Sequence, residues 1–135
     1  MPKDNIFKIT SCQSQIGKLE QYVSQISEEF DIDSDKYPDI LISLTEAVNN
    51  AIIHGNSRDI TKCVDIMCRC KEENLTFTIS DQGKGFNPEM ISNPLDDSNI
   101  EMEGGRGVLI MKSLCDEIQY SNEGRTVEMT FNIKK

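Results

Sequence analysis

The chain has 135 residues, of which 37% are hydrophobic and 27% charged, and its formal net charge at pH 7 is −9. This composition is typical of a globular protein, and the length fits one compact domain, which we expect to span residues 1–135. The negative charge disfavours nucleic acid as a direct partner, because neutralising phosphates requires clustered lysine and arginine. Because no apolar run approaches the roughly 20 residues that cross a bilayer and "MPKDNIFKIT" has no apolar signal core, we expect a cytoplasmic protein without membrane contact.

Five cysteines are scattered along the chain, and an odd number in a cytosolic protein argues against a framework of disulfides. Cys68 and Cys70 would share one face of a strand, but no second pair of cysteine or histidine residues completes a zinc site. We therefore expect the cysteines to pack as small buried hydrophobic residues: Cys12, Cys63, Cys68, Cys70 and Cys115.

The N-terminal part of the chain is predicted to form a strand followed by two helices. Residues 6–10 indicate a short strand, and apolar residues recur at helical spacing over about residues 11–30. The apolar face of this first helix would belong either to the core or to a dimer surface; it consists of Ile16, Leu19, Val23, Ile26 and Phe30. A second helix is expected over residues 35–54, since Pro38 is tolerated in a first turn and Gly55 suits a helix end.

The remainder of the chain is predicted to consist mainly of strands. Alternating apolar residues indicate strands over residues 63–71 and 75–80, joined by a turn at "EEN". A long segment to about Glu103 precedes a third helix that ends near Cys115, and a hairpin follows over residues 117–133. This order of elements predicts an α+β fold, a two-layer sandwich with helices on one face of a mixed, mostly antiparallel sheet.

The second predicted helix carries polar residues beside its apolar ones, in the stretch "SLTEAVNNAIIHGN" over residues 43–56. Glu46 and Asn50 are four residues apart and share one helix face, and His54 follows at the same spacing. Such a row is either a solvent-facing stripe or a site for a hard cation, because Mg²⁺ accepts carboxylate and amide oxygens beside phosphates and water. A carboxylate one turn from the metal could orient a hydroxyl or a water for attack on a phosphoryl group.

The stretch "DQGKGF", which follows the strand at 75–80, combines a carboxylate with two glycines. Asp81 ends the strand, and Gly83 and Gly85 permit close approach of the backbone to a flat ligand. A buried carboxylate at such a turn can accept a hydrogen bond from an exocyclic amine. The alternative interpretation is an ordinary glycine-containing turn.

The stretch "GGRGVLIM" over residues 104–111 places glycines immediately before an amphipathic helix. Unpaired N–H groups at a helix start, reinforced by the helix dipole and by Arg106, form a site for an anion, although a structural glycine bend is the alternative. The spacing matches neither a Walker A loop nor a Rossmann turn. Taken in order, the oxygen-donor helix, the Asp-x-Gly-x-Gly turn and the glycine-rich helix start indicate the parts of one nucleotide site.

These three stretches, in this order, resemble the N, G1 and G2 boxes of the GHKL ATPase superfamily, whose Bergerat fold is shared by histidine kinases and gyrase. "TEAVNNAIIHGN" resembles the N box, "DQGKGF" the G1 box and "GGRGVLIMKSLCDEI" the G2 region, and the resemblance spans about residues 6–133. Within the superfamily, the chain looks most like the anti-sigma factor serine/threonine kinases of the RsbW and SpoIIAB type. Its Gly-Gly-Arg-Gly start departs from the sporulation member, so a particular partner does not transfer.

The resemblance implies ATP and Mg²⁺ as ligands and assigns roles to individual residues. Glu46 would be the general base or the carboxylate that orients water, Asn50 would bind Mg²⁺, and Asp81 would accept the adenine amine. The remaining ATP-binding residues implied by the boxes are Gly83 and Gly85 beside adenine, Gly105, Arg106 and Gly107 around the phosphates, and Thr126 in support of Asp81.

The resemblance also implies a regulatory kinase that phosphorylates a STAS-domain anti-sigma antagonist and sequesters a sigma factor, and it implies a homodimer. The alternative is a nucleotide-gated partner-binding module without significant kinase activity. Residues 87–103 would form a lid over ATP, and His54 is expected to pack at a helix end rather than take part in catalysis.

Overall fold

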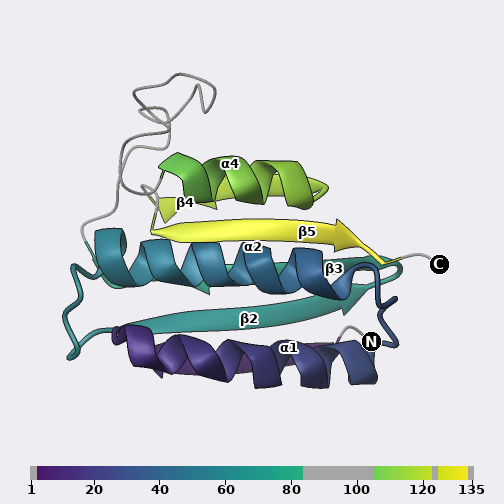
Figure 1. Cartoon of the computed structure of the whole chain (residues 1–135), viewed down its shortest axis with the longest axis horizontal. Coiled ribbons are helices and arrows are strands. Elements are labelled where there is room, and N and C mark those ends of the chain that lie inside the picture. Colours follow the sequence, from purple (N-terminus) through teal and green to yellow (C-terminus); the bar gives the residue numbers. More distant parts are fainter. Residues whose placement is uncertain (1–2, 84–104, 123–124, 134–135) are drawn as a thin grey trace.

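The computed structural model describes residues 3–83, 105–122 and 125–133. A five-stranded sheet forms one layer, and the helices lie in front of it as a second layer (Figure 1). The strands are β1 (Lys3–Thr10), β2 (Cys63–Lys71), β3 (Asn74–Ser80), β4 (Glu117–Ser121) and β5 (Thr126–Asn132), in the spatial order β1-β2-β3-β5-β4. The predicted α+β sandwich is confirmed, and every pairing among the described strands is antiparallel, so that this part of the sheet is not mixed.

The helices α1 (Gly17–Glu29), α2 (Tyr37–Asn50) and α4 (Gly105–Leu114) cover the same face of the sheet, with α2 between the other two (Figure 1). A 3-10 turn, η1 (Gln13–Ile16), leads into α1, and a π-helical turn, η2 (Ala51–Gly55), continues α2. The end of α2 and the start of α4 lie at the same end of the molecule (Figure 1). Within the described ranges, every helix is too short or too polar to serve as a membrane span.

The core lies between the helical layer and the sheet, because the strands alternate buried and exposed side chains. On α1, the apolar side chains of Leu19, Val23 and Ile26 are each 0% exposed, so this face belongs to the core rather than to a dimer surface. The buried strand residues that meet the helices include Ile66, Leu75, Phe77, Ile79, Val127, Met129 and Phe131.

The predicted elements are present, but several of their ends differ. β1 begins at Lys3 rather than at residue 6, and the first helix becomes α-helical only at Gly17. The second helix begins at Tyr37 and leaves the α-helical form after Asn50, where the π-helical turn η2 takes over. This last difference matters for the site, because a π turn closes i→i+5 hydrogen bonds and shifts the side chains that follow.

The cysteines are free thiols, and their burial differs from the expectation. Cys68 is buried in the core, as predicted, whereas the side chains of Cys12, Cys63, Cys70 and Cys115 are only partly buried. The expectation of burial is therefore wrong for these four.

Candidate functional site

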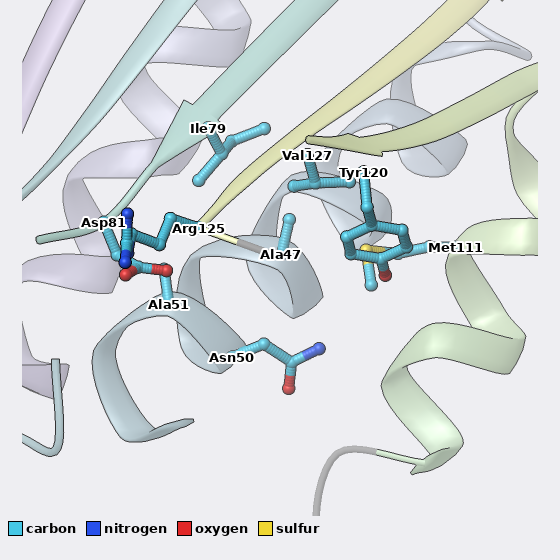
Figure 2. A pocket seen from close by; sticks show the side chains of 9 residues that line it. All are labelled: Ala47, Asn50, Ala51, Ile79, Asp81, Met111, Tyr120, Arg125 and Val127. Carbon is cyan, nitrogen blue, oxygen red and sulfur yellow. The ribbon is translucent and has the colours of Figure 1, made fainter. Parts of the chain in front are cut away.

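A small pocket lies between α2, α4 and the sheet (Figure 2). Asn50 and Asp81, which the sequence assigns to one nucleotide site from two separate stretches, both line this pocket. Its full lining is Ala47, Asn50, Ala51, Ile79, Asp81, Met111, Tyr120, Arg125 and Val127. The pocket therefore has apolar walls with a few polar groups, a composition typical of a ligand site.

Asp81 is the first residue after β3 and is fixed at both its backbone and its side chain. Its backbone N–H donates to the carbonyl of Arg125 at 2.9 Å, which keeps the end of β3 beside the start of β5. Its carboxylate oxygen Oδ1 accepts the N–H of Gly83 at 2.8 Å. Burial raises the pKa of the half-buried Asp81 carboxyl, while the Gly83 hydrogen bond and the positive charges of Arg125 and Lys62 oppose that rise. Asp81 is thus a positioned acceptor in a partly desolvated pocket.

Two glycines allow the turn after Asp81 to pack directly on the end of the second helix. A Cβ at Gly83 would overlap the backbone carbonyl of Gly55, and a Cβ at Gly55 would collide with the carboxylate of Asp81. Gly83 therefore fixes the turn after Asp81 against the end of the second helix, and its expected place beside adenine stays a prediction. Gly85, predicted for the same wall, lies outside the described residues.

Asn56 is a central residue of this region that the sequence interpretation missed. Its side chain is 0% exposed, and its Oδ1 accepts the backbone N–H of Gln82 at 2.7 Å. Its Nδ2 donates to Ser11 Oγ at 2.7 Å and to the carbonyl of Cys63 at 3.0 Å. Gln82 completes the connection, because its Oε1 accepts the N–H of Cys63 at 2.7 Å. Asn56 therefore ties the turn after Asp81 to the ends of β1 and β2.

The polar row predicted on the second helix does not stay in one row. Glu46 and Asn50 are both partly buried one turn apart on α2, but only Asn50 belongs to the pocket lining. The N–H of Asn56 bonds the carbonyl of Ala51 at 2.8 Å, an i→i+5 bond of the π turn, and His54 in that turn is exposed. The expectation that His54 packs at a helix end is therefore wrong.

The residue that faces the pocket at the start of β5 is Arg125, not Thr126. Side chains alternate along a strand, so Arg125 and Val127 face the pocket while Thr126 faces the opposite side of the sheet. There the Thr126 hydroxyl bonds Ser80 Oγ at 3.1 Å and accepts Asn122 Nδ2 at 3.0 Å. Its hydroxyl therefore does not support the Asp81 carboxylate in the way that the resemblance implies.

The glycine-rich segment begins α4, and α4 packs against α2. Gly105, Arg106 and Gly107 form the first turn of this helix, where backbone N–H groups have no partner within the helix. The side chains of residues 105–109 and the lid predicted over residues 87–103 lie outside the described part of the chain. The phosphate site expected at this helix start remains a prediction.

The fold is that of a histidine kinase-like ATPase domain, whose family model matches residues 9–131. A crystal structure of the RsbU and RsbW domains of a Mycobacterium tuberculosis protein resembles the chain with a TM-score of 0.70 and 13% sequence identity. The alignment covers 97% of this chain and 32% of that one, so the chain spans about a third of the solved protein. At this identity the likeness shows the fold alone. The match to the ATPase family model implies that ATP is the nucleotide.

Two relatives show which family within the histidine kinase-like ATPases the chain belongs to. The anti-sigma F factor of Anoxybacillus flavithermus is 36% identical over 118 residues, which cover 84% of this chain and 81% of that protein. The serine-protein kinase RsbW of Staphylococcus aureus is 35% identical over 109 residues, which cover 75% of this chain and 69% of the kinase. The chain therefore belongs to the family of anti-sigma factors and RsbW-type serine-protein kinases within the histidine kinase-like ATPases.

Proposed function

We propose that the chain is a regulatory serine/threonine kinase that phosphorylates a STAS-domain anti-sigma antagonist with ATP and also sequesters a sigma factor. The observation that carries this proposal is the meeting of Asn50 and Asp81 in one pocket of a chain related to an anti-sigma factor and to a serine-protein kinase. The names of the relatives support both halves of the role. We further propose, from the resemblance to the family, that the protein acts in the cytoplasm as a homodimer.

We place adenine at the end of the pocket that holds Asp81. The exocyclic amine of adenine is a donor, and the carboxylate of Asp81 is an acceptor held in place by the Gly83 N–H at 2.8 Å. The apolar side chains of Ile79 and Val127 line the same pocket and would contact the faces of the base. Gly83, together with Gly85, would keep the neighbouring backbone close to the ring because neither carries a side chain.

We place the phosphates between the end of α2 and the start of α4, which lie at the same end of the molecule (Figure 1). The amide oxygen of Asn50 is a hard donor in the pocket lining, which fits Mg²⁺, a cation that takes one or two protein ligands beside phosphates and water. When bound, Mg²⁺ neutralises charge on the phosphates. The N–H groups of Gly105, Arg106 and Gly107 at the start of α4, with the Arg106 charge, would bind phosphate oxygens.

The proposed transfer uses Glu46, one turn before Asn50 on α2. The serine or threonine hydroxyl of the antagonist attacks the γ-phosphorus, its proton passes to the Glu46 carboxylate, and ADP leaves with the electrons of the broken P–O bond. The protein contributes mainly position and charge neutralisation in this step.

The direct test is to incubate the purified protein with labelled ATP and a STAS-domain anti-sigma antagonist from the same organism. We expect label on a serine or threonine of that protein and complex formation with a sigma factor in the absence of the unphosphorylated antagonist. The kinase proposal fails if the chain binds ATP by calorimetry and yet transfers no label to the STAS protein.

One observation favours the second candidate function, a nucleotide-gated binding module. Glu46 does not belong to the described pocket lining, whereas the nucleotide-contacting candidates Asn50 and Asp81 do. In that case ATP would alter a partner surface without phosphoryl transfer. Cells that carry Glu46→Gln decide between the kinase and the binding module. A binding module would still regulate its partner in these cells, whereas a kinase would no longer do so.

A further inference from the structure

Three residues from different segments of the chain form a closed ring of hydrogen bonds. Asn56 Oδ1 accepts the backbone N–H of Gln82 at 2.7 Å, and Gln82 Oε1 accepts the backbone N–H of Cys63 at 2.7 Å. The carbonyl of Cys63 closes the ring, because it accepts Asn56 Nδ2 at 3.0 Å. The ring is joined to the pocket through Gln82, which directly follows the lining residue Asp81.

Two members of this ring are held by the rest of the fold. Asn56 is 0% exposed, and its Nδ2 donates to Ser11 Oγ at 2.7 Å as well as to the Cys63 carbonyl. Both amide hydrogens are therefore used, which leaves Oδ1 to face Gln82. Cys63 is the first residue of β2 and pairs with Thr10 of β1. Gln82 is exposed and lies outside the strands and helices, so the ring is what fixes it to the ends of β1 and β2.

The orientation of the Asp81 carboxylate depends on the backbone of Gln82. Asp81 Oδ1 accepts the N–H of Gly83 at 2.8 Å, and this N–H belongs to the peptide group between Gln82 and Gly83. A rotation of the Gln82 backbone would turn that peptide group and carry its N–H away from Oδ1. The ring opposes such a rotation, because it holds Gln82 at both its own N–H and its side chain.

We propose that Gln82 is a positioning residue, which acts through Asp81 and sets the preference of the site for a base with an exocyclic amine. The inference rests on the proposed contact between adenine and Asp81. A carboxylate that is held in one place accepts the amine of adenine with good geometry, whereas one that can turn loses part of this hydrogen bond. Gln82 itself contacts no part of the nucleotide.

The preference is measured with two nucleotides that differ only at this amine. Purine riboside triphosphate is ATP without its exocyclic amine, so it leaves the Asp81 carboxylate without a partner. Because an unsatisfied polar group in a partly desolvated site is costly, we expect the unchanged chain to bind Mg·ATP about tenfold or more tightly than this analogue. The ratio of the two affinities reports the Asp81 contact alone, since the sugar, the phosphates and Mg²⁺ are common to both ligands.

The test is calorimetric titration of the full chain and of two Gln82 variants with both nucleotides. Gln82→Met keeps the length of the side chain but has no oxygen to accept the Cys63 N–H, so we expect the ratio to fall about threefold or more. The loss should come from weaker Mg·ATP binding, while the analogue binds as before. Gln82→Glu keeps the acceptor oxygen and should retain the ratio within about twofold. A residue that only supported the fold would weaken the binding of both nucleotides alike.

Gln25→Met is the matched control, because Gln25 is an exposed glutamine of α1 outside the pocket lining. It should leave both affinities unchanged, and circular dichroism verifies that every variant is folded. An unchanged ratio in Gln82→Met, or an equal loss in Gln82→Glu, overturns the positioning role of Gln82 while the nucleotide site stands. If the unchanged chain itself binds both nucleotides equally, or binds neither, the contact between adenine and Asp81 fails, and the inference with it.

Discussion

The backbone of Gly83 packs against the carbonyl of Gly55 so closely that no side chain fits between them. This contact joins the turn after β3 to the end of the second helix, and it places the Asp81 carboxylate over the same Gly55. The end of the second helix and the turn after β3 are therefore held together beside the pocket, whose lining includes Ala51 and Asp81. This contact exists only because both positions lack a Cβ.

Gly83→Ala should therefore damage both stability and the site. A methyl group that overlaps a backbone carbonyl must push the two segments apart, so we expect a loss of about 1–3 kcal/mol in the free energy of unfolding, measured in urea. ATP affinity should fall at least tenfold by calorimetry, because Asp81 moves with the turn. Gly17→Ala is the control: a Cβ at Gly17 meets nothing within 4 Å and the residue is helical, so stability should stay equal or rise by about 0.5–1 kcal/mol. Equal stability of the two variants would contradict the close packing.

Asp81→Asn should bind ATP poorly and yet unfold less readily at neutral pH. An amide presents the adenine amine with a mismatched group, so ATP affinity should fall about ten- to a hundredfold. Because burial raises the folded-state pKa of the Asp81 carboxyl, its ionisation disfavours the folded state as pH rises through that pKa. The neutral amide has no such cost.

The pH dependence gives the sign of this effect. Below the ordinary carboxyl value of 3.8, Asp81 is protonated in both the folded and the unfolded state, so the stability difference between the two proteins should be smallest there. It should shift in favour of Asp81→Asn as pH rises towards 7, which urea titrations at several pH values measure. A shift in the opposite direction would mean that Arg125 and Lys62 outweigh burial at Asp81.

The sequence predicts that Asn50 and Asp81 belong to one site because each stands in a short stretch with a clear local pattern, and both residues line the pocket. Asp81 follows a strand with clear alternation, and β2 has the predicted bounds for the same reason. Asn50 lies on a helix whose apolar face is unmistakable. In these cases a local pattern fixes the position of the side chain, so no long-range information is needed.

Other features depend on contacts that no local pattern contains. The π turn at residues 51–55 adds a residue to the helical repeat, which carries His54 out to solvent. Whether Arg125 or Thr126 faces the pocket depends on the register of β5 against β3, and a shift of one residue exchanges the two. The burial of Asn56 depends on β1 and β2 ending beside the same turn.

Asn56→Ala should be strongly destabilising although Asn56 is not itself part of the described pocket lining. The change leaves the N–H of Gln82 and the carbonyl of Cys63 without their side-chain partner, so we expect a loss of about 3 kcal/mol in the free energy of unfolding. Asn74→Ala, an exposed asparagine at the start of β3, should change stability by less than about 0.5 kcal/mol. Denaturant unfolding of both variants measures the difference, and similar values for the two would contradict the role of Asn56.

Glu46→Gln should separate nucleotide binding from phosphoryl transfer. The amide keeps the size of the side chain, and Glu46 lies outside the described pocket lining, so ATP affinity should stay within about threefold by calorimetry. An amide cannot accept the hydroxyl proton of the substrate, so transfer to the STAS protein should fall about a hundredfold or more in a single-turnover assay with labelled ATP. Asp39→Asn, in the first turn of the same helix and far along it from Asn50, is the control with the same charge change and should retain transfer. Retained transfer in Glu46→Gln would remove Glu46 from the reaction and leave the charge neutralisation around the phosphates as the source of catalysis.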